Sequence, residues 1–246
     1  MISINQKKLV SSLKQKKFRT ELKLFVVEGV KLLDELLQSS YEVSAIYATK
    51  KWAESNPSIQ CTEISEKELK SISSLKSPNE VLAVVKQKAV VLDDMYSQLN
   101  IALDKVRDPG NFGTIIRTAD WFGIQNIICS ADSVDLYNPK VLQATMGSFF
   151  RMNVIATDLV AFFTVNKELK IYGALLDGEN VYEKTLNPKG AVLLMGNESK
   201  GISDELKPFI NESILIPNFG QAESLNVATA TAIFCSEYMR NSYSSR

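Results

Sequence analysis

The stretch Ala191-Val-Leu-Leu-Met-Gly-Asn-Glu-Ser-Lys-Gly-Ile202 decides the fold of this 246-residue chain. Its first five residues are apolar without alternation, which is typical of a strand buried on both faces of a parallel sheet. Gly196 and Gly201 then predict a tight loop. Further strands are expected at residues 101–104, 126–129, 152–156, 171–176 and 214–216. Because helical patterns alternate with these strands, the sequence predicts an α/β domain with a mainly parallel sheet.

The loop at residues 196–202 differs from the common nucleotide-binding loops. A P-loop carries Lys-Ser or Lys-Thr directly after its second glycine, whereas Ile202 and Ser203 follow Gly201 here. A dinucleotide fingerprint with a downstream acidic residue is also missing. The sequence therefore disfavours both ligand classes, and it predicts a loop whose backbone amides hold another ligand beside the carboxylate of Glu198.

Another loop follows the strand expected at residues 101–104. A Pro-Gly pair predicts a turn there, and a helix that begins near Asn111. Arg117 projects about 200° away from Ile115, which lies on the apolar face of this helix, so the arginine is free to reach a ligand. Asn111 is also suited to cap the helix. The residues alone leave open a capped helix with an exposed arginine and no further role.

The third loop follows the strand expected at residues 214–216. The alanine-rich residues after Leu225 predict a helix that is buried nearly all round. Ser224 and Asn226 would then lie in its first turn, where polar side chains need partners. Ser224 could be only a cap. Asn226, one turn inside the expected helix, is less readily explained in that way.

The N-terminal part predicts a small mixed domain. Strands are expected at residues 25–28, 43–48 and 81–85, and a helix at residues 30–37. Residues 86–98 mix polar residues with few strong signals and are the expected linker. The predicted domains are therefore residues 1–90 and residues 98–246.

Basic and acidic residues are equal in number, 28 of each, but they are unevenly distributed. Residues 1–24 carry seven lysines and arginines against the single acidic residue Glu21. Such a basic arm on a neutral body is expected where one end of a chain meets phosphate. A solvated helix face whose lysines only confer solubility is the alternative on charge alone.

Composition excludes several classes of protein. The chain has no histidine, so no mechanism can use an imidazole base or a histidine ligand, and no metal site is predicted. The three cysteines lack a CxxC pair, which indicates buried thiols in a reduced compartment. Since no stretch has the pattern of a signal peptide or a membrane span, a cytoplasmic protein without membrane association is expected.

The three loops together resemble, in the family's order, the motifs of the SpoU (TrmH-like) RNA 2′-O-ribose methyltransferases, which belong to the knotted SPOUT superfamily. The resemblance covers residues 101–239. It is carried by Asn111 with Arg117, by Gly196-Asn197-Glu198 with Gly201, and by Ile216-Pro217 with Ser224-Leu225-Asn226-Val227. At the N-terminus, Phe25-Val-Val-Glu-Gly-Val-Lys-Leu-Leu33 and Ser77-Pro78 resemble the family's accessory RNA-binding domain, an L30e-like ribosomal-protein fold.

This resemblance implies a deep trefoil knot within residues 190–240, S-adenosylmethionine as the cofactor, and a homodimer. The implied cofactor-binding residues are Leu194, Met195, Gly196, Asn197, Gly201, Ile216, Pro217 and Leu225. The implied catalytic residues are Asn111, Arg117, Glu198, Ser224 and Asn226. Contacts to RNA are expected from Lys14, Lys16, Lys17 and Arg19 of the basic arm and from Arg151. Arg151 ends a segment that resembles one near the family's RNA cleft, and a surface arginine beside a strand is an equal alternative.

The implied reaction is attack by a ribose 2′-hydroxyl on the sulfonium methyl group, in which positioning contributes most. An arginine, with a pKa above about 12, is a poor base. We therefore expect Arg117 to orient the target phosphate or stabilise the developing alkoxide, while a phosphate oxygen takes the proton. Asn111 is expected to hold Arg117 or the ribose, and Glu198 to fix Arg117 or its own loop. Ser224 and Asn226 would organise the same side of the knot.

Structured RNA, and ribosomal RNA in particular, is the expected substrate, on family analogy alone. A transfer RNA 2′-O-methyltransferase and a catalytically silent RNA-binding protein of the same fold stay open as alternatives. The GXXG pattern at residues 110–113 would suit a KH module, but it follows a strand instead of lying between two helices. A base-directed enzyme of a related knotted family fits Arg117 and residues 224–226 less well.

Overall fold

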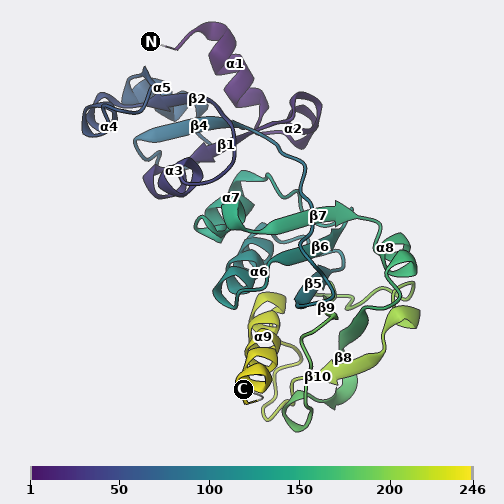
Figure 1. Ribbon diagram of the computed structural model, residues 1–246. Coiled ribbons are helices and arrows are strands. Elements are labelled where there is room, and N and C mark those ends of the chain that lie inside the picture. Colours follow the sequence, from purple (N-terminus) through teal and green to yellow (C-terminus); the bar gives the residue numbers. More distant parts are fainter. Residues whose placement is uncertain (1, 245–246) are drawn as a thin grey trace. The chain divides into compact units, whose positions relative to one another are not determined.

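The computed structural model describes residues 2–244, which form two compact units (Figure 1). The C-terminal unit consists of Val90–Val134 and the residues from Arg151 onward. The N-terminal unit consists of the residues up to Ala89 together with Asp135–Phe150. The sequence predicted two consecutive domains, whereas the structure groups the internal segment Asp135–Phe150 with the N-terminal residues.

The C-terminal unit is built on a six-stranded sheet in the order β10-β8-β9-β5-β6-β7. Every pairing between its strands is parallel, so the predicted α/β architecture with a mainly parallel sheet is confirmed. Its elements are β5 (Leu99–Leu103), α6 (Pro109–Trp121), β6 (Asn126–Ser130), β7 (Asn153–Thr157), α8 (Leu159–Val165), β8 (Lys170–Asn180), η2 (Val181–Glu183), β9 (Ala191–Met195), η3 (Lys207–Phe209), β10 (Glu212–Leu215) and α9 (Val227–Ser244).

Side chains of the C-terminal unit fill a core on each face of the sheet. Ala102, Val192 and Leu194 face α8, whose Phe163 packs in the same cluster. Successive side chains of a strand point to opposite faces, so Ile101 is buried on the other face. Helices α6 and α9 pack together there (Figure 1). With both faces covered, the loops at the carboxyl ends of the strands are the part of the unit left to bind a ligand.

The N-terminal unit has a four-stranded sheet in the order β1-β4-β2-β3, in which β4 is antiparallel to both of its neighbours. The expected strands and helix correspond to β1, β2, β4 and α3, while the two-residue β3 carried too short a pattern to predict. Its elements are α1 (Ile4–Ser12), α2 (Lys16–Leu22), β1 (Leu24–Glu28), α3 (Val30–Leu37), β2 (Val43–Ala48), α4 (Lys50–Ser55), β3 (Thr62–Glu63), α5 (Glu66–Ile72), β4 (Val81–Lys86), α7 (Pro139–Thr145) and η1 (Ser148–Arg151), whose last residue is assigned to the C-terminal unit.

The internal segment Asp135–Phe150 completes the core of the N-terminal unit. Leu142 and Phe149 from this segment are buried in one cluster with Phe25 of β1 and Leu33 of α3. The rings of Phe25 and Phe149 pack edge to face, with 5.9 Å between their centroids. The opposite face of the sheet is covered by α1 and α5. This unit is therefore made from two stretches of chain that are distant in sequence.

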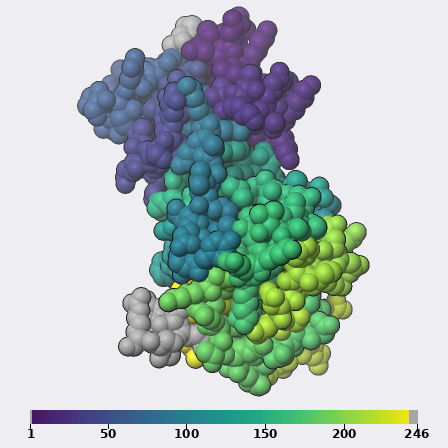
Figure 2. Space-filling view, turned by 45° about the vertical axis from the view of Figure 1, so that its right-hand side comes forward, coloured from purple at the N-terminus to yellow at the C-terminus, as the bar shows by residue number. Residues whose placement is uncertain are grey.

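Helices α1 and α2 bring most of the basic arm to the surface of this unit, in the purple part of Figure 2. Lys14, Lys16 and Lys17 are exposed. The Lys14 ammonium group also donates a hydrogen bond of 2.7 Å to the carbonyl oxygen of Ser73. These three lysines thus lie where RNA can reach them, as a predicted contact requires.

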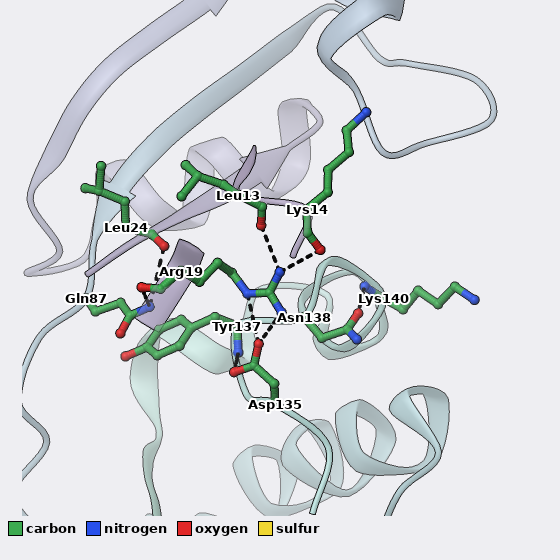
Figure 3. A network of polar contacts seen from close by, with 9 residues as sticks. All are labelled: Leu13, Lys14, Arg19, Leu24, Gln87, Asp135, Tyr137, Asn138 and Lys140. Atoms are coloured by element: carbon green, nitrogen blue, oxygen red, sulfur yellow. Dashed lines mark hydrogen bonds and ion pairs between the residues drawn. The ribbon is translucent and has the colours of Figure 1, made fainter. Parts of the chain in front are cut away.

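Arg19 is an exception in the basic arm, because its side chain is buried and paired (Figure 3). Its Nε donates to Oδ2 of Asp135 at 2.9 Å, and Nη2 donates to the same oxygen. Its Nη1 donates to the carbonyl oxygens of Leu13 at 2.8 Å and Lys14 at 2.9 Å. The carbonyl oxygen of Arg19 accepts from Nε2 of Gln87 at 2.9 Å. Arg19 therefore ties the corner between α1 and α2 to the internal segment.

The predicted RNA contact from Arg19 is corrected by this network. Arg19 is 3% exposed, and its guanidinium group is occupied by a carboxylate and two carbonyl groups, so it cannot reach a phosphate. Its partner Asp135 lies 116 residues further along the chain. A charge count over residues 1–24 contains no sign of a partner so distant in sequence.

The two neighbouring cations of α2 should respond differently to truncation. We predict that Arg19→Ala lowers the free energy of unfolding of the N-terminal unit by about 3 kcal/mol, because it leaves the partly buried Asp135 carboxylate without its ion-pair partner. The matched variant Lys17→Ala removes an exposed charge and should change the same quantity by less than about 0.5 kcal/mol. Urea unfolding of the full chain measures both. Equal stabilities of the two variants would contradict the structural role of Arg19.

Candidate functional site

The three loops singled out in the sequence leave the carboxyl ends of β5, β9 and β10. Strands β5 and β9 are neighbours in the sheet, with Leu103 opposite Met195 at their last paired position. Ligands of open parallel sheets bind outside the carboxyl ends of the strands. The first two loops therefore begin side by side at the edge where a site is expected.

The first loop leads into α6 with Asp108 as the N-cap. Its carboxylate accepts a hydrogen bond of 2.7 Å from the backbone N–H of Asn111, and Pro109 occupies the first turn. The interpretation that Asn111 caps the helix is therefore wrong. Because Asp108 takes that position, the Asn111 side chain is available to groups outside its own helix.

The side chain of Asn111 joins the three loops. Its Nδ2 donates to Oε1 of Glu198 in the second loop at 2.9 Å. Its Oδ1 accepts from Nδ2 of Asn226 in the third loop at 2.8 Å. Three of the five predicted catalytic residues are thereby brought into one hydrogen-bonded cluster, although 115 positions separate the first from the last.

Asn197 shapes the second loop from within. Its Oδ1 accepts from the backbone N–H groups of Ser199 at 3.0 Å and Lys200 at 3.2 Å. Its backbone N–H and carbonyl exchange hydrogen bonds of 2.9 Å with those of Gly201. Its Nδ2 also donates to Oε2 of Glu198 at 3.3 Å. The Glu198 carboxylate is thus held from both sides by amide donors, those of Asn197 and Asn111.

The glycines of the second loop are required by its tight closure. A Cβ atom at Gly196 would overlap the backbone of Gly201 and Ile202. Gly201 itself has φ +67°, a left-handed conformation that other residues rarely adopt. The tight loop predicted at residues 196–202 is present, and it depends on the missing Cβ at Gly196 and the left-handed backbone at Gly201.

The third loop departs from its prediction at Ser224 and Asn226. Both residues are exposed and precede α9, which begins at Val227, so neither lies in the first turn of a buried helix. Asn226 is the cap of α9, because its Oδ1 accepts from the backbone N–H groups of Ala228 at 2.9 Å and Thr229 at 3.2 Å. The same amide group caps α9 through its oxygen and contacts Asn111 through its nitrogen.

Arg117 lies on the exposed side of α6, away from its apolar face, as its spacing predicted. Among the described residues, no side chain pairs with its guanidinium group. Glu198 was expected to fix Arg117 or its own loop; its carboxylate accepts from Asn197 of that loop and from Asn111, and not from Arg117. Arg117 is thus left able to bind a ligand.

Arg151 is held beside α6 by an ion pair. Its Nη2 donates to Oδ2 of Asp120 at 2.8 Å, and its Nε donates to the same oxygen at 3.2 Å. Asp120 lies one helical turn after Arg117. The side chain of Arg151 is 49% exposed, so it presents a paired charge to solvent.

The remaining predicted cofactor residues differ in exposure. Leu194 and Met195 are buried at the end of β9, where Leu194 is part of the core. Ile216 and Pro217 are partly buried, and Leu225 is 50% exposed. The first two residues fix the start of the second loop, and the other three present apolar surface on the third.

Sequence reasoning missed the residues that support the second loop. Asp104 and Lys105, at the end of β5, bond to Ser203 after that loop. The signal that could have indicated them is an acidic residue directly after a buried parallel strand, where ligand loops begin.

The arrangement suits positioning more than proton transfer. The cluster consists of amide groups around one carboxylate, with a cationic guanidinium on the same helix as Asn111. Amides can donate to and accept from hydroxyl groups at once, and a guanidinium binds phosphate in a bidentate manner. Cys235, a buried residue of α9, stays a thiol at neutral pH, because burial raises its pKa to about 12.

Comparison with protein families assigns both parts of the chain. The SpoU rRNA Methylase family matches residues 98–236. The MRM3-like substrate binding domain matches residues 5–83. The first match covers more than half of the chain and contains all three loops.

Relatives similar over most of the chain agree with this assignment. The 23S rRNA (guanosine(2553)-2′-O)-methyltransferase RlmP of Bacillus subtilis is 33% identical over 223 residues, which are 89% of each chain. The structure of a TrmH-family protein from Porphyromonas gingivalis has a TM-score of 0.88 and 37% identity, and covers 98% of this chain and 99% of that one. An rRNA methyltransferase from Sinorhizobium meliloti, solved with bound AdoMet, has a TM-score of 0.84 and 29% identity, with 98% and 97% covered.

None of the helices within residues 2–244 is both long and apolar enough to cross a membrane. In the same residues, no group of three or more cysteine, aspartate or glutamate side chains is arranged to hold a metal ion. The matched motifs, the parallel sheet and the similarity along nearly the whole chain agree with one another. The chain belongs to the SpoU rRNA Methylase family.

Proposed function

We propose that this protein transfers a methyl group from S-adenosylmethionine to a ribose 2′-hydroxyl of ribosomal RNA. The observation that carries the proposal is the cluster of Asn111, Glu198 and Asn226, which unites three loops at the carboxyl edge of the parallel sheet. The names of its relatives support the substrate and the reaction, since RlmP methylates a 2′-oxygen of 23S rRNA. The AdoMet-bound relative from Sinorhizobium meliloti supports the cofactor.

The residues of the loops fit S-adenosylmethionine. Leu225, Ile216 and Pro217 present apolar surface of the kind that an adenine ring covers. The Asn111 and Asn226 amides supply donors and acceptors for ribose hydroxyls, and the Glu198 carboxylate supplies an acceptor. When bound, the cofactor supplies an electrophilic methyl group on a sulfonium sulfur. The predicted contacts from Leu194, Met195, Gly196, Asn197 and Gly201 are part of this proposal.

Arg117 is the residue we propose to act on the RNA. Its exposed guanidinium group is suited to hold the phosphate next to the target ribose and to stabilise the alkoxide as it forms. Since a guanidinium has a pKa above about 12, the proton of the 2′-hydroxyl passes to another acceptor, for which we propose a phosphate oxygen of the RNA. Asn111, Glu198 and Asn226 hold the loops in register for this step. Ser224 lies two residues before Asn226 and is exposed, so its hydroxyl group is available to the target ribose.

We propose the N-terminal unit as the part that binds the RNA outside the reacting nucleotide. Its match to a substrate binding domain and the exposed Lys14, Lys16 and Lys17 support this role. We retain Arg151 as a phosphate contact of the C-terminal unit. Ribosomal RNA is preferred over transfer RNA because RlmP and the Sinorhizobium meliloti protein, which both match most of the chain, carry ribosomal names. A silent RNA-binding protein of the same fold would bind RNA without transferring methyl groups.

Three further properties belong to the proposal. We infer a trefoil knot within residues 190–240 from the family resemblance. An L30e-like fold is inferred for the N-terminal unit from its mixed four-stranded sheet with helices on both faces. A homodimer in the cytoplasm, where ribosomal RNA is found, is inferred from the family resemblance. We also retain the domain functions predicted from the sequence, which are substrate binding for residues 1–90 and methyl transfer for residues 98–246.

Labelled methyl transfer tests the proposed function directly. Purified protein is incubated with methyl-labelled S-adenosylmethionine and total RNA, and the RNA is then hydrolysed with alkali. We predict label in ribosomal RNA, recovered in alkali-resistant dinucleotides, because a methylated 2′-oxygen cannot attack the neighbouring phosphate. Label in transfer RNA alone would favour the alternative substrate. RNA binding without any incorporation of label would contradict the enzyme and favour the silent protein.

Truncation of Arg117 should separate chemistry from cofactor binding. We predict that Arg117→Ala lowers kcat for methyl transfer by at least about 100-fold, because the charge that stabilises the reacting groups is lost. The Kd for S-adenosylmethionine should stay within about twofold of the wild-type value, since no proposed cofactor contact involves this side chain. Lys167→Ala, which removes an exposed cation elsewhere in the C-terminal unit, is the matched control. Full activity of Arg117→Ala would contradict its assignment.

A further inference from the structure

Asp104, at the carboxyl end of β5, holds the far end of the second loop. The residue is 1% exposed. One oxygen, Oδ2, accepts from both the backbone N–H of Ser203 at 2.7 Å and the Ser203 hydroxyl at 2.6 Å. Its own backbone N–H donates to the carbonyl oxygen of Met195 at 2.9 Å. A buried carboxylate needs such partners, and here both come from Ser203, just after the loop, while the backbone of Asp104 bonds to Met195, just before it.

Lys105 holds the near end of the same loop. Its carbonyl oxygen accepts from Nδ2 of Asn197 at 2.8 Å, and its Nζ donates to the Ser203 hydroxyl at 3.0 Å. Its backbone N–H donates to the Ser130 hydroxyl at 2.8 Å. The residue has φ +55°, a left-handed conformation that is costly for a lysine. Such a conformation persists only where surrounding contacts stabilise it, as these three do.

Two consecutive residues therefore fix both ends of the loop to one strand. Asn197 at its beginning bonds to Lys105, and Ser203 just after its end bonds to Asp104. Glu198, which positions Asn111, lies between these two points. A loop fixed in this way loses less conformational entropy when a ligand binds, so its affinity for that ligand is higher.

We propose that Asp104 is a positioning residue for cofactor binding, acting through Ser203 to keep the loop at residues 196–202 in its binding conformation. The inference rests on the proposed function, because S-adenosylmethionine is the ligand in question. Asp104 does not touch the cofactor itself. Removing the Ser203 bonds should let the loop open in part of the molecules. The observed Kd then equals the Kd of the closed form divided by the fraction of molecules in which the loop is closed.

The N-terminal unit contains a matched arrangement that serves as a control. The buried carboxylate of Glu28 accepts from the Ser73 hydroxyl and from the backbone N–H of Ser74 at 2.9 Å. Ser73→Ala and Ser203→Ala thus each remove a serine hydroxyl from a buried carboxylate. Only the second change affects the loop that is proposed to bind the cofactor.

The test is the Kd for S-adenosylmethionine by isothermal titration calorimetry of the full chain. Ser203→Ala should raise this Kd about three- to tenfold, which is less than the full effect of a lost hydrogen bond to a charged group because the bond from the Ser203 backbone remains. Ser73→Ala should leave it within about twofold. The KM for RNA should be the same in both variants, while the KM for S-adenosylmethionine rises in Ser203→Ala only.

Substitutions at Asp104 provide the second readout. Asp104→Ala removes both acceptors and should raise the Kd more than tenfold, whereas Asp104→Asn keeps an acceptor for the Ser203 N–H and should recover part of the loss. If Asp104→Ala does not fold, Ser203→Ala decides the question. The proposal is overturned if Ser203→Ala binds like the wild type, or if Ser73→Ala loses as much affinity. A wild-type protein that does not bind S-adenosylmethionine would contradict the proposed function instead.

Discussion

The amide side chain of Asn111 is the point on which the site depends. Its two polar atoms contact Glu198 and Asn226, so one residue fixes the relative positions of loops that follow three different strands. The geometry requires that Asn111 not cap its own helix, and Asp108 fulfils that condition by accepting from the Asn111 backbone. It also requires that the second loop be fixed, which the Asp104–Ser203 and Lys105–Asn197 contacts provide. A parallel sheet with both faces covered supplies the common edge on which these contacts meet.

The parts of the fold that sequence predicted are those governed by local pattern. The uninterrupted apolar run at residues 191–195 forms β9, because a strand between two parallel neighbours has no face in water. Gly196 and Gly201 predicted a tight loop, and the structure contains one in which a Cβ atom at Gly196 would overlap the backbone and Gly201 has a positive φ. Arg117 was predicted to be exposed from helical spacing alone, and it is.

The parts that sequence did not predict depend on contacts between distant residues. Asn226 looked like a residue inside a helix, since composition cannot locate the residue at which a helix begins, and its own capping bonds fix the start at Val227. In the sequence, Arg19 is one more cation of a basic arm. In the structure, its side chain pairs with Asp135 of the internal segment. That segment carries no compositional signal of its own, because its apolar residues would suit either unit. Distant pairs of this kind account for most of the differences between expectation and structure.

The three loops act as one unit through Asn111, and a double-mutant cycle of Asn111 and Asn226 tests this coupling most directly. The measurement is kcat/KM for methyl transfer by the wild type, Asn111→Ala, Asn226→Ala and the double variant. If the two side chains work through their shared hydrogen bond, the double variant should lose little more than the worse single variant, with a coupling energy of about 1 kcal/mol or more. Losses that simply multiply would mean that the residues act independently, and would contradict the account.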